Sequence, residues 1–251
     1  MPRSSSKWSR CVVAAIASGV CRVALGGHPM LTEDTGTQGT GNAELELGYS
    51  WADDAGNRSF LFQPQLSYGA TPTLDLIVQP SWYSNDIAGD RVQGAGDTNL
   101  DFKWRFLGHD PYSLALRAGV TVATSQHDIG LPDGRIAEHV VLVGTYDAAP
   151  LTIDANLGYA HNPDVVDLRA NLYHLSAAAL YAASDRLSLV VDVDVDSNAD
   201  AAKSSNPAVA LVGAIYTCRP GLDIDVGYRA GLNSAAIARQ WLLGITFRGA
   251  P

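Results

Sequence analysis

The sequence predicts an all-β protein, a single antiparallel up-and-down transmembrane β-barrel of about twelve strands. Three observations lead to this prediction. Apolar and polar residues alternate along stretches of about ten residues, as in 187–197, where Leu189, Val191 and Val193 alternate with Asp192 and Asp194. The connections alternate between tight turns and longer polar links. No uninterrupted apolar run long enough for a spanning helix follows the first residues.

The chain starts with a pattern typical of an export signal. Basic residues precede an apolar run at Cys11–Val20, which is too short to span a bilayer. Small residues near Gly26 offer a cleavage site, so 1–26 is predicted to be a signal peptide. Residues 27–41 are polar and Gly-rich and are predicted to form an irregular N-terminal segment. The barrel is then expected over 42–251.

Charge and cysteine content exclude several function classes. The chain has 17 Lys and Arg against 26 Asp and Glu. The predicted signal takes away four basic and no acidic residues, so the mature chain carries 13 positive and 26 negative side chains, a net charge of −13. This charge argues against nucleic acid and anionic lipid surfaces as partners. Cys218 is the one cysteine after the signal, so no disulfide within the chain is expected.

The strands are justified by alternation and by the turn residues between them. They are predicted near 42–51, 59–69, 74–83, 98–107, 113–122, 137–147, 151–161, 170–182, 187–197, 207–216, 222–230 and 239–247. Longer polar links are predicted at 84–97, 123–136, 162–169, 198–206 and 231–238. An even strand number puts both barrel ends on the rim with tight turns, which is periplasmic in outer-membrane barrels. Composition alone also suits a soluble β-sandwich, but a sandwich has no reason to sort its loops this way.

Two prolines lie inside predicted strands, Pro64 and Pro80. A closed barrel has no edge strand, so a residue without a backbone N–H removes a hydrogen bond from the ladder. Each proline is therefore expected to mark a bulge or the end of a strand.

Three segments resemble a known family. They are His28-Pro-Met-Leu-Thr-Glu-Asp-Thr-Gly-Thr-Gln-Gly with the strand Glu44-Leu-Glu-Leu-Gly-Tyr, Gly94-Ala-Gly-Asp-Thr-Asn-Leu-Asp-Phe-Lys-Trp-Arg-Phe, and Trp241-Leu-Leu-Gly-Ile-Thr-Phe. Together they are similar to the outer-membrane "transporter" family, also labelled as the MetA-pathway phenol-degradation family. The resemblance implies an outer-membrane β-barrel that passes small molecules, aromatic or apolar compounds among them. The partners it implies are outer-membrane lipid, small solutes and the barrel assembly machinery.

The polar parity of the strands predicts the residues that line the lumen. Those expected near mid-height are Asp101, Lys103, Arg105, Asp192, Asp194 and Asp225. Charges at these positions would be costly against lipid and are tolerated facing water or each other. An acidic excess would favour cations over anions. The alternative, in which Lys103 and Arg105 pair with the acids and seal the lumen, stays open.

A lipid-modifying barrel enzyme is a further alternative. His174 and Ser176 share one strand face, and a tight turn at 183–186 would bring Asp194 or Asp192 opposite them. Serine, histidine and carboxylate are the groups of nucleophilic catalysis. However, the group would point into the lumen, away from a lipid substrate, so no enzyme activity is predicted.

No metal site or cofactor is predicted. The histidines show no metal-ligand spacing, and Asp192, Asp194 and Asp196 form a linear ladder, which is a poor cage for an ion. The sequence therefore favours passive passage of small molecules through the outer membrane of a Gram-negative-type envelope. A non-conducting structural or adhesive barrel that acts through its loops is the remaining alternative.

Overall fold

The computed structural model describes residues 28–54, 57–87, 90–125, 136–162 and 168–249. The strands are β1 (Ala43–Asp54), β2 (Asn57–Thr71), β3 (Leu74–Gln79), β4 (Trp82–Ile87), β5 (Asp90–Ala95), β6 (Thr98–His109), β7 (Tyr112–Val122), β8 (Ile136–Ala148), β9 (Leu151–His161), β10 (Asn171–Ser184), β11 (Leu187–Asp196), β12 (Ala208–Arg219), β13 (Leu222–Gly231) and β14 (Arg239–Arg248). Among these described residues, no helix has the length and apolar character needed to cross a membrane. The predicted signal peptide lies outside the described residues.

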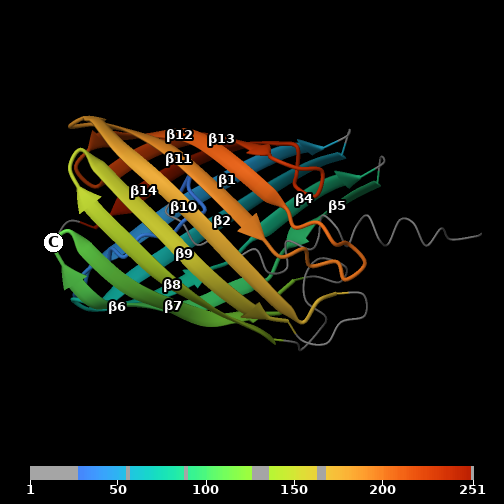
Figure 1. Cartoon of the computed structure of the whole chain (residues 1–251), viewed down its shortest axis with the longest axis horizontal. Coiled ribbons are helices and arrows are strands. Elements are labelled where there is room, and N and C mark those ends of the chain that lie inside the picture. Colours follow the sequence, from blue (N-terminus) through green and yellow to red (C-terminus); the bar gives the residue numbers. More distant parts are fainter. Residues whose placement is uncertain (1–27, 55–56, 88–89, 126–135, 163–167, 250–251) are drawn as a thin grey trace, which may run out of the picture.

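The strands close into one antiparallel barrel (Figure 1). Closure is made by β1, which pairs with β2 on one side and with β14 on the other, from Glu44 opposite Arg248 to Asp53 opposite Arg239. β3 and β4 follow one another along β2, and β5 and β6 together form the next position in the wall. The fourteen strand segments therefore make a twelve-stranded barrel, which confirms the predicted fold class.

The prediction of a loop over 84–97 is wrong. β4 and β5 occupy most of this range as a hairpin that extends past the neighbouring strands at the end opposite the C-terminus (Figure 1). β4 also pairs with β2, from Arg58 opposite Asp86 to Phe62 opposite Trp82. The polar residues of this stretch have low strand propensity and therefore suggested a link. However, β4 pairs with a strand on each side, and these tertiary contacts outweigh the low propensity.

The two prolines interrupt the same point of the wall. Pro80 falls between β3 and β4, as expected for a strand end. Pro64 lies within β2, where it pairs with Leu47 of β1 on one side. On its other side β2 changes partner, from Phe62 opposite Trp82 to Leu66 opposite Val78, which places Pro64 opposite Pro80. The two prolines, which cannot donate a backbone hydrogen bond, therefore lie opposite each other at the one point where β2 changes partner.

The outside of the barrel is apolar and the inside is polar. Along β11, Val191 and Val193 are 53% and 51% exposed, whereas Asp192 and Asp194 between them are 2% and 5% exposed. A soluble sandwich would reverse this arrangement by burying its apolar face. Because the apolar side chains surround the polar ones, hydrocarbon is the medium that fits the outer surface, and the fold is that of an outer-membrane β-barrel.

The two rims differ. Tight turns join β3 to β2, β7 to β6, β9 to β8, β11 to β10 and β13 to β12 at one end, named here the turn rim. Both ends of the barrel lie at this rim, where the Gly249 N–H donates to the Ala43 carbonyl at 2.8 Å. The opposite end, the loop rim, carries the longer connections, together with the short ones from β1 to β2 and from β4 to β5. This confirms the predicted sorting of turns and places both barrel ends on the side that is periplasmic in such barrels.

Candidate functional site in the lumen

Residues 28–41, named here the lumen segment, lie inside the barrel, where Figure 1 shows them in blue. They have no helix or strand, and the sequence did not predict their position. The segment enters at the turn rim, where the Gly41 N–H donates to the Gly69 carbonyl at 2.8 Å and the Gly69 N–H donates to the Asn42 carbonyl at 2.9 Å. A Cβ on Gly69 would collide with the backbone of Gly39, so a glycine is needed for this close approach.

Glu33 of the lumen segment is held by two buried cations. Its carboxylate lies 2.8 Å from the Lys103 Nζ of β6 and 2.5 Å from the Arg117 Nη1 of β7. The exposed fractions of these side chains are 4% for Glu33, 8% for Lys103 and 0% for Arg117. Buried charges are tolerated when they are paired and hydrogen-bonded, and each of these charges is.

Asp101 continues the same network across the wall. Its carboxylate accepts from Arg117 Nε at 2.8 Å and Nη2 at 2.7 Å, and it lies 2.8 Å from the His139 Nε2 of β8. Gln65 accepts from Arg117 Nη2 at 3.1 Å. The guanidinium is thus shared between the segment and the barrel wall, and it ties Glu33 to β2, β6 and β8.

The backbone of the lumen segment is also bound by the wall. Asn156 of β9 accepts from the Glu33 N–H at 2.7 Å and donates its side-chain amide to the Glu33 carbonyl at 2.9 Å. Asp192 of β11 accepts from the N–H groups of Leu31 and Thr32 at 2.6 and 3.0 Å, and from the Thr32 hydroxyl at 2.7 Å. These contacts satisfy backbone groups that water would otherwise have to satisfy.

Glycines of the wall make room for the start of the segment. A Cβ on any of four of them would lie within 3.1 Å of an atom of His28 or Pro29. These glycines are Gly48, Gly213, Gly227 and Gly244. His28 Nδ1 then reaches Asp225 Oδ1 at 2.5 Å, and Met30 packs in an apolar cluster with Ala178, Val190, Leu211 and Leu242. The segment is therefore fitted to the wall by shape as well as by charge.

A cavity of about 330 Å³ lies between the lumen segment and the loop rim. Residues of the segment, including Met30 and Leu31, form part of its lining, together with residues of the loop rim such as Asn198 and Ala235. The wall contributes His174, Asp194 and Asp196, among others. The turn-side half of the lumen is thus occupied by chain, while the loop-side half holds open space.

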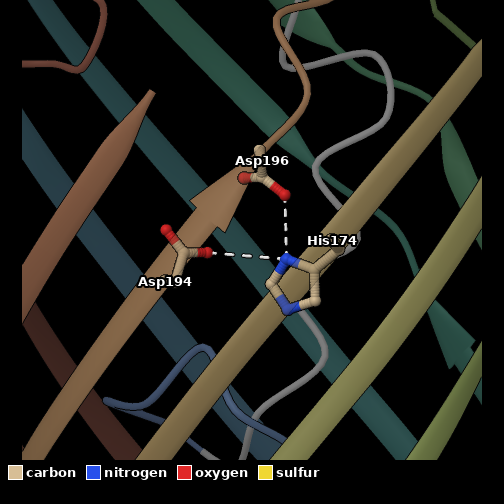
Figure 2. A group of neighbouring side chains, drawn as sticks. All are labelled: His174, Asp194 and Asp196. Atoms are coloured by element: carbon tan, nitrogen blue, oxygen red, sulfur yellow. Dashed lines mark hydrogen bonds and ion pairs between the residues drawn. The ribbon is translucent and has the colours of Figure 1, made fainter. Parts of the chain in front are cut away.

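Figure 2 shows His174 of β10 with its Nδ1 directed at Asp194 and Asp196 of β11. The Nδ1 lies 2.8 Å from Asp196 and 3.6 Å from Asp194, and His174 Nε2 lies 3.1 Å from the Ser176 Oγ. The strand register sets Asp196 opposite His174 and Asp194 opposite Ser176. Asp194 is where the enzyme alternative expected it, but the hydrogen-bonding carboxylate is Asp196. Asp192 lies opposite Ala178 instead.

The six predicted lumen residues lie in three different environments. Asp101, Lys103, Asp192 and Asp225 are buried and bound to the lumen segment or to its partners. Asp194 faces the loop-side cavity, and Arg105 lies near the turn rim, 3.4 Å from the Pro72 carbonyl. The anticipated pairing of cations with acids therefore occurs, through Lys103 and Arg117 rather than through Arg105.

Sequence reasoning missed the part that Glu33 plays. Lys103 and Arg117 stand on the lumen parity of neighbouring strands, which indicates that anionic groups meet them inside the barrel. The Glu-Asp pair at 33–34, within an otherwise uncharged Gly- and Thr-rich stretch, is the signal that could have located the partner.

Comparison with known proteins assigns the family. The family model described as "Putative MetA-pathway of phenol degradation" matches residues 83–249, so the chain belongs to this family. Among curated proteins, none matches the chain.

Solved structures share the fold at low identity. The COG4313 outer membrane channel from Pseudomonas putida F1 is 12% identical, with a TM-score of 0.71 over 86% of this chain and 98% of that chain. The KdgM porin in complex with disordered oligogalacturonate is 9% identical, with a TM-score of 0.61 over 82% and 99%. The NanC porin is 11% identical, with a TM-score of 0.57 over 82% and 98%.

Proposed function

We propose that the protein is an outer-membrane channel for the passive passage of small molecules, and that the lumen segment sets the size of its path. One observation supports this proposal most strongly. The barrel encloses a charged lumen that is narrowed on the turn side by the lumen segment, which is held against the wall by ion pairs and hydrogen bonds. Fold neighbours that are channels and porins agree with this proposal.

The proposed path has an acidic wall. The buried charged side chains of the described lumen include the cations Lys103, Arg117 and Arg229. They also include the acids Glu33, Glu44, Glu46, Asp75, Asp101, Asp154, Asp192, Asp194, Asp223 and Asp225. An excess of carboxylates raises the local concentration of cations. We therefore propose that the path prefers cations, with Asp101, Lys103, Arg105, Asp192, Asp194 and Asp225 along it.

The substrate class follows from the family. Its description concerns phenol degradation, so we propose small aromatic or apolar compounds as solutes. A cavity of about 330 Å³ is at the lower end of the range for small-molecule sites, which fits a molecule of that size.

Single-channel recording tests the proposal. The purified full-length barrel in a planar bilayer should give discrete currents, and reversal potentials in a salt gradient should show cation preference. Changing both Asp192→Asn and Asp194→Asn should reduce that preference. Asp53→Asn, on the hairpin at the loop rim and half exposed, is the matched control and should change nothing. Absence of current would favour the structural or adhesive alternative, and acyl release from lipid by the same sample would favour the enzyme alternative.

A further inference from the structure

We propose that His174, Asp194 and Asp196 bind a divalent transition-metal cation such as Zn²⁺ on the wall of the loop-side cavity. The sequence argued against a metal because the three aspartates of β11 form a linear ladder. The structure adds an imidazole from the neighbouring strand, which changes the ladder into a cluster. One ligand atom from each of the three residues lies within 4.8 Å of the other two.

The spacing of the ligand atoms fits an ion. A tetrahedral Zn²⁺ about 2.0–2.1 Å from each ligand sets the ligand atoms about 3.3 Å apart. The Nδ1 of His174 lies 2.8 Å from Asp196 and 3.6 Å from Asp194, on either side of that value. Rotation of the two carboxylates brings their oxygens to an ion in front of Nδ1, the direction in which both already point (Figure 2).

A second partner holds the imidazole in the orientation that a metal ligand needs. His174 Nε2 lies 3.1 Å from the Ser176 Oγ. If Nε2 carries the proton and donates it to Ser176, Nδ1 keeps a lone pair directed at the carboxylates. Metal-binding histidines commonly donate their other N–H in this way, which fixes the tautomer and the ring position. Gly158 of β9, opposite His174 in the register, leaves room for this side chain, because a Cβ on Gly158 would lie 3.0 Å from the His174 Cβ.

Charge balance favours a divalent ion over a proton. A protonated His174 offers one positive charge to two carboxylates, so the group of three keeps a negative charge. A divalent cation bound to a neutral imidazole neutralises both carboxylates. Nitrogen and oxygen donors together suit Zn²⁺ and its neighbours among the transition metals rather than Ca²⁺, which takes oxygen ligands.

An ion can reach the site from the cavity. The exposed fractions of the side chains are 15% for His174, 5% for Asp194 and 21% for Asp196, and all three line the cavity of about 330 Å³. Three protein ligands leave at least one coordination position for water. The ligands stand on two adjacent paired strands, so little ordering is needed when the ion binds.

Calorimetric titration of the full-length barrel in detergent with Zn²⁺ tests the proposal, with protein purified without a polyhistidine tag. We expect one bound ion per chain. Loss of a ligand should cost more than the about 10- to 100-fold that is typical of outer-shell partners, so the affinity should fall by more than about 100-fold in His174→Gln and in Asp196→Asn. His161→Gln is the matched control because His161 lies at the same rim and contacts Asn171 at 3.1 Å. Its affinity should equal that of the unchanged protein.

The outcome of the titrations decides whether the proposal stands. No binding by the unchanged protein, or equal binding by His174→Gln and Asp196→Asn, overturns the proposal. The heat-dependent shift of folded barrels on gels shows which variants are folded, and Asp196→Asn, at the rim, keeps the test valid if His174→Gln does not fold. A Co²⁺ absorption spectrum that disappears in His174→Gln would identify imidazole ligation directly.

Ser176→Ala separates metal binding from a catalytic role. It removes the hydroxyl that serine chemistry needs but keeps all three ligands, so it should still bind Zn²⁺, with at most about a 10- to 100-fold loss of affinity. Loss of all Zn²⁺ binding in this variant would count against the ligand set. None of these measurements requires current, so the metal proposal and the channel proposal can fail separately.

Discussion

The two halves of the lumen handle charge differently. On the turn side, Lys103 and Arg117 meet Glu33 and Asp101, and the space between them is filled by the lumen segment. On the loop side, Asp194 and Asp196 meet one imidazole, and a cavity remains. On the turn side the charged side chains bind the protein's own chain, whereas on the loop side they line a cavity that has room for a solute or an ion.

This difference shows that ion pairs with the wall hold the lumen segment in place. Without Glu33, the buried Lys103 and Arg117 would lose the carboxylate that lies 2.8 Å from the one and 2.5 Å from the other, and breaking a buried ion pair is costly. The segment and the wall therefore stabilise each other, because each provides the ionic partners of the other.

The largest effect is expected from removing the segment. Deletion of 28–38 with residues 1–27 kept should raise single-channel conductance severalfold, because it clears the turn-side half of the lumen. An unchanged conductance would show that the segment does not restrict the path. The Asp53→Asn variant is again the control for insertion and folding.

Next in size is the loss of the central carboxylate. Glu33→Gln removes the partner of Lys103 and Arg117 and should lower the free energy of unfolding by about 3–5 kcal/mol, as for other broken buried pairs. Urea unfolding of the detergent-refolded barrel measures it. Asp34→Asn is the control, because Asp34 is 46% exposed and lies 3.9 Å from Lys103.

A double variant sharpens this prediction. Adding Lys103→Met to Glu33→Gln removes a cation that has lost its partner, so the two effects should not add, and the double variant should regain part of the stability. Additive losses would mean that the pair is not the unit that holds the segment.

A smaller effect is expected from filling the space that the wall glycines leave for His28 and Pro29. Gly227→Val places side-chain atoms where Pro29 lies, since even a Cβ would be 2.9 Å from the Pro29 Cβ. Overpacking of this kind costs about 1–3 kcal/mol, which should loosen the segment and increase current noise. Gly144→Ala is the matched control, because its Cβ would meet its nearest neighbour at 3.4 Å, an ordinary contact. Equal noise in the two variants would contradict the proposed fit.

The smallest effect is expected at Arg105. Its Nη2 donates a hydrogen bond of 3.4 Å to the Pro72 carbonyl, outside the buried network. Arg105→Gln should change stability by less than about 0.5 kcal/mol. A loss as large as that of Glu33→Gln would show that Arg105 belongs to the turn-side network.

The wall could be predicted from the sequence because strand alternation is local. The parity that put Asp101 and Asp192 inside and Val191 outside depends only on neighbouring residues. The hairpin of β4 and β5 was missed because its polar residues resemble a link, and its pairing with β2 is a property of the closed sheet.

The position of the lumen segment could not be predicted for a different reason. Residues 28–41 have no periodicity, and the groups that hold them come from distant strands, among them Arg117 of β7, Asn156 of β9 and Asp192 of β11. The cluster at His174 was only half visible, since the sequence placed His174 and Ser176 on one face but left open which aspartate stands opposite.

The binding of the segment by so many strands has a consequence for the order of assembly. Its anchors are complete only when β1 has met β14, because Glu46 of β1 and Asp225 of β13, which both contact His28, lie on either side of that seam. The first residues of this part of the chain to be synthesised are thus among the last to settle, and they take their final place after the cylinder has already joined.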